Sequence, residues 1–338
     1  MQCVLGVDGG NTKTIALVAA LDGTILGAGR GGCGDIYNAE AGTAWPDSAA
    51  AAIANIEYAV LTALQAAHVK ASDLVTAVFS MAGADWPEDF AYIEAAMEDR
   101  GFGRTIHVQN DALGVLHAGS LDATGVSVVC GTGAATGARA ADGRVWHSST
   151  WQNQVQGSAH LGRKTLNAVY RAELGIEPPT TLIPRVLDFY GLNTVEEVLH
   201  LFTSRVTQVP ENVDQLTPIL LDEAQAGDRV AMRIVQEHGW ALGDYALAAA
   251  RRVGIEGTAF TLVFAGGVFR HPSSLLADAI IERVRTTSPA VQPTRCRFEP
   301  IIGVLFTALE AAGGAVNDAL LEKLIPTIPD TTLFSTIL

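Results

Sequence analysis

One pattern occurs twice in this chain, and it constrains the fold more than any other feature. In the first copy, an apolar strand over residues 3–7 enters the glycine turn of LGVDGGNTKT, and a second strand covers 14–21. In the second copy, a strand over 125–130 enters the turn Gly131-Thr132-Gly133. In both copies an Asp-Gly dipeptide then separates the last two strands, as is typical of antiparallel hairpins. The repeat predicts two related domains that each begin with a three-stranded meander.

Strands alternate with helices between and after these two copies. Apolar runs and proline or glycine punctuation predict strands over 74–81, 104–108, 260–264 and 295–298. The same signals predict helices over 44–67, 87–100, 273–286 and 301–312, and a mostly helical region over 158–253. Alternation of this kind implies parallel strand pairing, so the fold class we predict is α/β.

The length of 338 residues fits about two domains at roughly 150 residues each. We expect a first domain over 1–115 and a second over 116–312 that carries the helical insertion. We expect the remaining segment, 313–338, to pack back on the first domain. Hydrophobic residues make up 49% of the chain and charged residues 17%, which argues against intrinsic disorder.

Several classes of function are disfavoured by the composition. The net charge of −14 argues against nucleic-acid binding, which usually needs a basic face. None of the four cysteines forms a Cys-x-x-Cys pair, and the eight histidines lack metal-ligand spacing, so we expect no zinc site. We also expect no signal peptide and no membrane-spanning run, and we predict a cytoplasmic protein.

The two glycine turns have the chemistry of a phosphate site. Only glycine lets backbone N–H groups approach a phosphate chain without a Cβ in the way. Thr12 and Thr132 offer hydroxyls, Lys13 can balance phosphate charge, and Asp8 can hold a hydrated Mg²⁺ ion. Either turn alone could be a plain hairpin in which glycine adopts a positive φ. Two such turns, each leading a repeated meander, favour the phosphate interpretation, although neither matches the P-loop or Rossmann motif.

Five segments resemble the actin-like ATPase superfamily, which includes sugar kinases. They are VDGGNTKT and VVCGTGA for the two phosphate motifs, NDALG for the catalytic aspartate, FAGGVF for adenosine and PIIGVLFTALEA for the closing helix. The resemblance implies two ribonuclease H-like (actin-like ATPase) domains flanking a nucleotide cleft. Within the superfamily the chain is most similar to the BadF/BadG/BcrA/BcrD ATPase family. That family includes N-acetylglucosamine kinase, glucosamine kinase and activators of 2-hydroxyacyl-CoA dehydratases.

The resemblance implies ATP and Mg²⁺ as cofactors and assigns roles to matching residues. Asp8 would hold Mg²⁺, and Asp111 would accept the proton of the sugar hydroxyl. Taken alone, Asp111 could instead be the N-cap of the helix that begins at Ala112, and both roles are compatible. The residues implied to bind the phosphates and adenosine are Gly9, Gly10, Asn11, Thr12, Lys13, Gly131, Thr132, Gly133, Gly266 and Gly267.

The sugar side departs from the family pattern. Related kinases carry an asparagine after the third strand, and either Asp35 or Asn38 could take that place. They also carry a G-W-G-H-x-x-G-D-E-G-S loop, and here Val155 and Gln156 stand where the acidic pair would be. The expected acceptor contacts are Asp35, Asn38, Asn110, Asp111, Trp151, Gln156 and Ser158. Because the loop carboxylate is lost, we expect an acidic or differently substituted amino sugar, or a smaller polyol, rather than plain N-acetylglucosamine.

The expected function is an ATP-dependent kinase that phosphorylates a hydroxyl of an amino sugar or related sugar. One alternative is a non-catalytic or regulatory ATP-binding protein of the same fold. Another is a dehydratase activator, although the cysteine pair that would ligate an iron–sulfur cluster is not evident. The partner implied is a small sugar acceptor, and a homodimer is left open.

Overall fold

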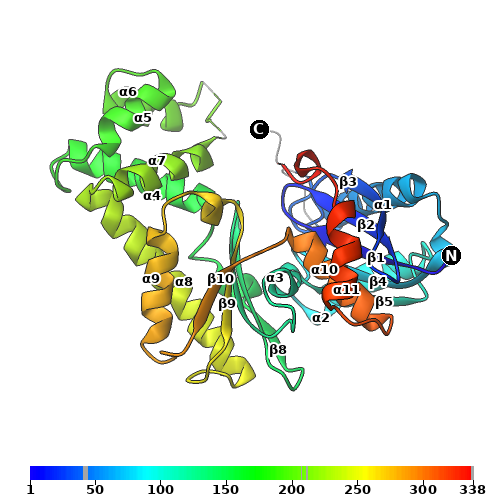
Figure 1. The fold of residues 1–338 in the computed structure, drawn as a ribbon. Coiled ribbons are helices and arrows are strands. Elements are labelled where there is room, and N and C mark those ends of the chain that lie inside the picture. Colours follow the sequence, from blue (N-terminus) through cyan, green and yellow to red (C-terminus); the bar gives the residue numbers. More distant parts are fainter. Residues whose placement is uncertain (41–44, 207, 211, 336–338) are drawn as a thin grey trace.

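The computed structural model describes residues 1–40, 45–206, 208–210 and 212–335, and it contains two five-stranded sheets (Figure 1). The first sheet has the strand order β3-β2-β1-β4-β5, and the second has the order β8-β7-β6-β9-β10. The first contains β1 (Cys3–Gly9), β2 (Thr14–Ala20), β3 (Ile25–Gly31), β4 (Leu74–Met81) and β5 (Thr105–Asn110). The second contains β6 (Gly125–Cys130), β7 (Ala134–Arg139), β8 (Val145–His147), β9 (Thr261–Ala265) and β10 (Gln292–Arg295).

The two sheets share one topology. In each, the first three strands form an antiparallel meander, and the first strand then pairs in parallel with the fourth, which pairs in parallel with the fifth. The predicted α/β class and the predicted duplication are therefore confirmed. Because parallel strands end at the same edge, the ends of β1, β4 and β5 converge beside the first glycine turn.

The helices of the first domain cover its sheet. Helix α1 (Asp47–Ala67) packs on β2 and β3, and α2 (Pro87–Glu98) packs on β5. We expected no run that could span a membrane, but α1 is long and apolar enough to do so, with a mean hydropathy of 1.3 over its window. In the structure Ile53, Ile56 and Val60 are buried against the sheet, so core packing accounts for the apolar character of α1. Residue 44, the predicted start of this helix, lies outside the described residues.

Two helices lie between the sheets (Figure 1). Helix α3 (Asp111–Gly119) contacts β6, β7 and β9, and α10 (Pro300–Ala311) packs on β1 and β4 while crossing α3. By packing, α10 belongs to the first sheet, although the range 116–312 assigned it to the second domain. Helix α11 (Asp318–Leu324) adds Leu320 and Leu324 to the cluster around Val4 and Leu17. The three-part division of the chain remains a proposal.

A helical layer covers the second sheet. Helix α8 (Arg229–Val253) packs on β6, β7 and β8, with α9 (Leu275–Arg285) beside it. The predicted helical region contains α8 and also α4 (Ser158–Glu173), α5 (Leu182–Tyr190), α6 (Val195–Thr203) and α7 (Leu216–Gln225). Short 3-10 helices are η1 (Ala71–Asp73), η2 (Ser149–Gln152), η3 (Val213–Gln215), η4 (Gly267–Arg270), η5 (Ile325–Thr327) and η6 (Thr331–Leu333).

One strand was predicted at the wrong place. The sequence predicts a strand over 295–298. In the structure the strand is β10 (Gln292–Arg295), which begins three residues earlier and pairs with β9. It is an edge strand in which Gln292, Pro293 and Arg295 are exposed. A proline and polar side chains are tolerated at an edge, where one side of the strand needs no ladder partner. Its sequence therefore gives no apolar signal.

Candidate active site

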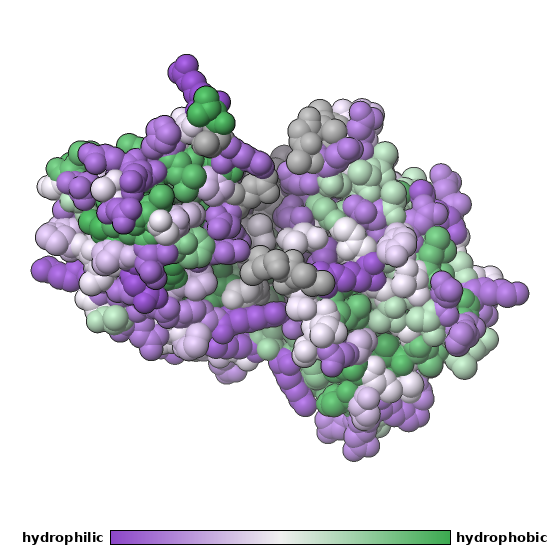
Figure 2. Space-filling model, turned by 90° about the horizontal axis from the view of Figure 1, so that it is seen from above, coloured by the Kyte–Doolittle hydropathy of each residue, from purple (hydrophilic) through white to green (hydrophobic). Residues whose placement is uncertain are grey.

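A cavity of about 1070 Å³ lies between the two domains. It lies where β1 and β6 run into the two glycine turns. Figure 2 shows the groove between the two lobes from above. The turns face each other across it, and Thr12 Oγ1 lies 3.4 Å from Thr132 Oγ1. Among the predicted residues, both turns, both members of Gly266-Gly267 and Asp111 line this one cavity. The structure thus gathers groups that are far apart in sequence.

The first turn is closed by its own backbone. The N–H of Gly10 donates to the carbonyl of Lys13 at 2.9 Å, and the N–H of Gly34 donates to the carbonyl of Gly10 at 3.0 Å. Residues 10–13 line the cavity, whereas Gly9 is not among its lining residues. The Cβ of any other residue at position 9 would lie 2.1 Å from Met81 Cε. A side chain at position 9 would thus require Met81 to move, and the predicted contact of Gly9 with phosphate finds no support.

The second turn is held by the start of α4. The N–H of Ser158 donates to the carbonyl of Gly131 at 2.7 Å, and the N–H of Gly131 donates to the carbonyl of Gly133 at 2.9 Å. A Cβ at position 157 would lie 2.1 Å from the oxygen of Gly131, so only glycine fits there. The positive end of the α4 dipole thereby adjoins the turn, an arrangement that suits an anion.

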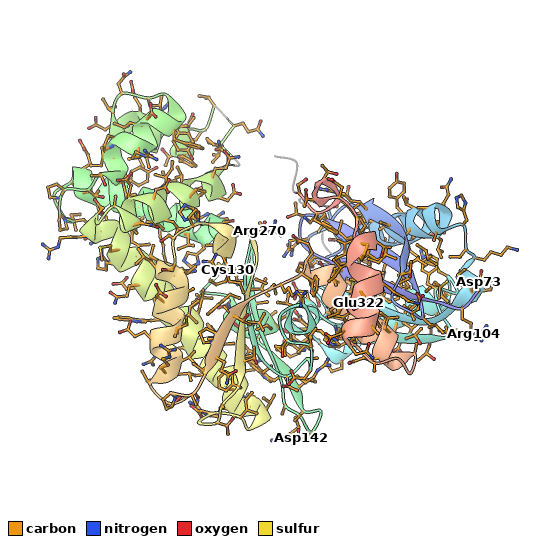
Figure 3. The ribbon with its side chains drawn as sticks, in the orientation of Figure 1. Asp73, Arg104, Cys130, Asp142, Arg270 and Glu322 are labelled. Carbon is orange, nitrogen blue, oxygen red and sulfur yellow. The ribbon has the colours of Figure 1, made fainter. Side chains whose placement is uncertain are left out.

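The third glycine segment follows β9. Gly266 has a φ of 102°, and a Cβ there would lie 2.4 Å from the carbonyl oxygen of Cys130. Both its conformation and its packing thus require glycine. Cys130 and Arg270 lie at this end of the second sheet (Figure 3). The guanidinium of Arg270 donates to both carboxylate oxygens of Glu299, at 2.7 and 2.9 Å, and this ion pair joins η4 to the start of α10.

Asp111 is the first residue of α3, and its carboxylate is half-buried at the cavity wall. The N-cap is Asn110, whose side-chain oxygen accepts from the N–H of Ala112 at 3.1 Å, so the N-cap interpretation of Asp111 is wrong. Burial, followed by the charges of Asp8 and Asp85, raises the pKa of Asp111 to about 7. A carboxylate that titrates near neutral pH is suited to accept a proton.

Asp8 lies at the end of β1 and faces the same cavity. Burial raises its pKa to about 7, the charge of Lys13 opposes this rise, and the charge of Glu299 adds to it. A divalent cation would relieve the cost of burying this carboxylate. No cluster of three His, Cys, Asp or Glu side chains that could hold a metal occurs in the part of the chain that the structure describes. A single carboxylate fits a hydrated Mg²⁺ ion, which usually keeps several waters and takes further oxygens from phosphates.

The ammonium group of Lys13 is engaged by the end of the chain. It donates to the backbone carbonyl of Phe334, and Phe334 also lines the cavity. Arg30 beside it donates to the carbonyls of Leu333 at 3.0 Å and Ser335 at 2.6 Å. Burial and then the charge of Arg30 lower the pKa of Lys13. The segment after α11, which the sequence analysis expects to pack on the first domain, therefore lies beside the first glycine turn at the phosphate end of the cavity.

Both residues proposed for the asparagine position of the sugar site line the cavity. Asp35 is 5% exposed, and its carboxylate accepts from the N–H of Tyr37 and from the amide of Asn38, each at 2.8 Å. The amide of Asn38 also lies 3.4 Å from the side-chain oxygen of Asn11. Asp35 thus positions Asn38, and Asn38 connects this end of the cavity to the first phosphate turn.

The loop over residues 150–162 behaves differently from its expected role. Trp151 is 67% exposed and is not among the lining residues, because its neighbour Gln152 is the residue that turns inward. The side chain of Gln152 accepts from the hydroxyls of Thr136 and Ser148, each at 2.8 Å. These bonds leave Trp151 pointing outward, so the structure gives no support to its predicted contact with the acceptor.

Gln156 and Ser158 do line the cavity, but Gln156 is already occupied. Its side-chain oxygen accepts from the N–H of Ala134 at 3.3 Å, and its amide nitrogen donates to the carbonyl of Gln152. Val155 packs against the core of the second domain. The loop therefore braces the second turn, and neither residue at the position of the acidic pair presents a free polar group.

Sequence reasoning missed several cavity residues. Asp85 follows β4 and accepts from the amide of Asn110 at 3.3 Å, and it also bonds to the side chain of Ser149. Its position directly after a buried strand was an available signal. Ser149, which has a φ of 43°, and the Arg270–Glu299 pair carry no comparable signal, because each depends on elements that are distant in sequence.

Comparisons with known proteins agree with this architecture. The chain is 24% identical over 321 residues to an N-acetyl-D-glucosamine kinase of Dictyostelium discoideum, covering 92% of this chain and 98% of the relative. It is 26% identical over 313 residues to an N-acetylmuramic acid/N-acetylglucosamine kinase of Clostridium acetobutylicum, covering 91% of this chain and 98% of that protein.

A solved structure shares the fold. A candidate N-acetylglucosamine kinase from Chromobacterium violaceum aligns with a TM-score of 0.65 and 22% identity, covering 91% of this chain and 99% of the other. The predicted fold of two α/β domains is thereby confirmed. The model of the BadF/BadG/BcrA/BcrD ATPase family matches residues 5–308, so the chain belongs to this family.

Proposed function

We propose that this protein is an ATP-dependent kinase that transfers a phosphoryl group to a hydroxyl of an amino sugar. Membership of an ATPase family implies that it uses ATP. One observation carries the proposal: Asp111 lines the same cavity as two opposed glycine turns, and the charges of Asp8, Asp85 and Asp35 all act on it. Two relatives aligned over nearly their full lengths are named as kinases of N-acetylated amino sugars.

The residues of the cavity supply the steps of phosphoryl transfer. Residues 10–13 and 131–133 bind the phosphates, and Gly266 and Gly267 lie against the adenosine. Mg²⁺, when bound beside Asp8, neutralises phosphate charge. Asp111 accepts the proton of the acceptor hydroxyl as that oxygen bonds to the γ-phosphorus and the bond to ADP breaks. Asn110 acts by positioning, because it caps α3 and thereby fixes the residue that follows it.

The setting proposed for this reaction is the cytoplasm, and the partner is a small sugar acceptor. The net charge of −14 gives no reason to expect nucleic acid. The homodimer that the resemblance suggested is a prediction that light scattering of the purified protein would check.

The two alternative functions have weaker support. A non-catalytic ATP-binding protein would have no need for a carboxylate at the sugar end whose pKa is raised to about 7. A dehydratase activator needs cysteines that can ligate a cluster. Here Cys3 and Cys130 are buried in different sheets, and Cys33 and Cys296 are partly buried after β3 and β10, respectively.

An acceptor screen tests the proposal. ADP formation is measured with hexosamines, N-acetylhexosamines, muramic acid and its N-acetyl form, and each product is checked by mass spectrometry for a sugar phosphate. We expect ADP release that depends on the acceptor and equals the sugar phosphate formed. ATP binding without turnover on any of these sugars would overturn the kinase in favour of the regulatory alternative.

A further inference from the structure

The sugar end of the cavity carries negative charge, and none of the described residues that line this end is a lysine or an arginine. Its acidic residues are Asp35, Asp85 and Asp111. The cationic side chains among the described lining residues are Lys13, Arg270 and His271. Lys13 belongs to the first glycine turn, and Arg270 and His271 follow Gly266-Gly267, so all three accompany the segments assigned to the nucleotide; their partners are Phe334, Glu299 and Asp222. The nine residues that the structure does not describe are 41–44, 207, 211 and 336–338, and their sequence includes no lysine, arginine or histidine.

Asp85 is connected to the proposed catalytic residue through Asn110. Asp85 accepts from the amide of Asn110, the residue that caps α3 and precedes Asp111. On the opposite side it bonds to Ser149 of the second domain. Asp35 and Asp85 both line the cavity and each has two hydrogen-bond partners, but Asp85 is half-buried whereas Asp35 is only 5% exposed. Asp85 is therefore the carboxylate that is best placed to meet an acceptor substituent beside the reacting hydroxyl.

The two loop residues at the position of the acidic pair offer the acceptor no free polar group, although Thr150 and Asn153 of the same loop line the cavity. Gln156 is bonded at both ends of its amide, and Val155 packs into the core. Ala134 and Ala135, which follow the second turn, line the cavity without a polar side chain. The carboxylates at the sugar end therefore come from the first domain, with Asp35 after β3, Asp85 after β4 and Asp111 after β5.

Charge decides which substituent fits. A set of carboxylates in a partly buried cleft repels an anion and attracts a cation, because the low-dielectric walls screen the charges poorly. Acetylation of an amine removes its charge, and an acidic substituent would add to the repulsion. Of the acceptors expected from the sequence, the acidic amino sugar thus loses its support, and a differently substituted amino sugar keeps it.

We propose that Asp85 is a specificity residue that pairs with a free ammonium group of the acceptor, so that the substrate is an unacetylated amino sugar. This inference rests on the proposed kinase function. It places the ammonium beside Asp85 and the reacting hydroxyl beside Asp111. A charge-assisted hydrogen bond of this kind is stronger than a neutral one and distinguishes the amine from its acetylated form.

Steady-state kinetics with glucosamine, N-acetylglucosamine and glucose test the inference. We expect the wild type to prefer glucosamine by about tenfold or more in kcat/KM, the factor that 1.4 kcal/mol of discrimination produces. Asp85→Asn should raise the KM for glucosamine by about tenfold and change that for N-acetylglucosamine by less than about threefold. The matched control is Asp142→Asn. Asp142 is an exposed carboxylate in the turn at the far end of the second sheet (Figure 3), so this substitution should leave the KM for each of the three sugars unchanged.

The outcomes distinguish a failure of the role proposed for Asp85 from a failure of the proposed kinase function. If none of the sugars stimulates ADP formation, the kinase proposal fails. If N-acetylglucosamine is phosphorylated at least as well as glucosamine, or if Asp85→Asn weakens both sugars equally, only the role of Asp85 is overturned. Should the variant not fold, the wild type still decides. Its KM for glucosamine should rise as the pH increases through the titration of the sugar amine, while its KM for N-acetylglucosamine stays level.

Discussion

The pH dependence of turnover provides a direct readout of Asp111. Burial and the charges of Asp8 and Asp85 raise its pKa to about 7 in the free protein. A general base acts in its ionised form, so kcat/KM should fall as the pH drops through this pKa. At pH 5, two units below, about one free protein molecule in 100 carries the ionised base, so this pKa sets an upper limit of about 100-fold on the fall in kcat/KM.

Asp85→Asn perturbs this profile in a predictable direction. The charge of Asp85 is one cause of the raised pKa of Asp111, so its removal should move the acidic limb to lower pH. Mg²⁺ bound beside Asp8 would move the limb the same way in every variant, because it opposes the charge of that carboxylate. Asp142→Asn, distant from the cavity, should leave the limb in place.

The assay is kcat/KM for the acceptor between pH 5 and 9 at saturating ATP and Mg²⁺, with tryptophan fluorescence confirming that the protein stays folded. A flat profile across this range would refute the assignment of Asp111 as the base. An acidic limb that Asp85→Asn leaves unmoved, or moves to higher pH, would refute the electrostatic coupling between the two carboxylates.

Three further predictions concern the nucleotide half of the cavity. Lys13→Met should raise the KM for ATP by roughly tenfold or more through loss of a phosphate-balancing charge, and an unchanged KM would remove Lys13 from the site. Gly157→Ala should destabilise the fold by about 1–3 kcal/mol in urea unfolding and weaken ATP binding, because its Cβ would lie 2.1 Å from the oxygen of Gly131; wild-type values for both would contradict that packing. The domains should close over ATP and acceptor to exclude water, so small-angle scattering should show compaction relative to the free protein, and identical profiles at saturation would contradict closure.

The sheets and the glycine turns were predictable because their signals are local. Apolar runs ending in Asp-Gly or glycine turns determine strands and hairpins within about ten residues of chain, and the repeat of that pattern predicted two matching sheets. Strand β10 was misplaced because Pro293 and its exposed neighbours carry no apolar signal. Helix α11 was missed because only its buried face, which includes Leu320 and Leu324, identifies it.

The two halves of the candidate site differ in predictability for the same reason. Phosphate binding relies on consecutive backbone groups, so a run such as residues 10–13 can be found from the sequence alone. The sugar end depends on tertiary contacts: Asp85 meets Asn110 and Ser149 only in the folded chain. The orientation of Trp151 depends on the hydrogen bonds of its neighbour Gln152, which a sequence motif does not reveal.

The measurement that tests the central claim most directly is phosphoryl transfer by the wild type and by Asp111→Asn, followed together with ATP binding. The account predicts that the wild type converts ATP and an amino sugar into ADP and a sugar phosphate in equal amounts. It predicts that Asp111→Asn, which preserves the size of the side chain, binds ATP with an unchanged Kd but forms the product ~10²–10⁴-fold more slowly. A variant that forms sugar phosphate at the parental rate, or a wild type that forms none with any amino sugar, would contradict the account.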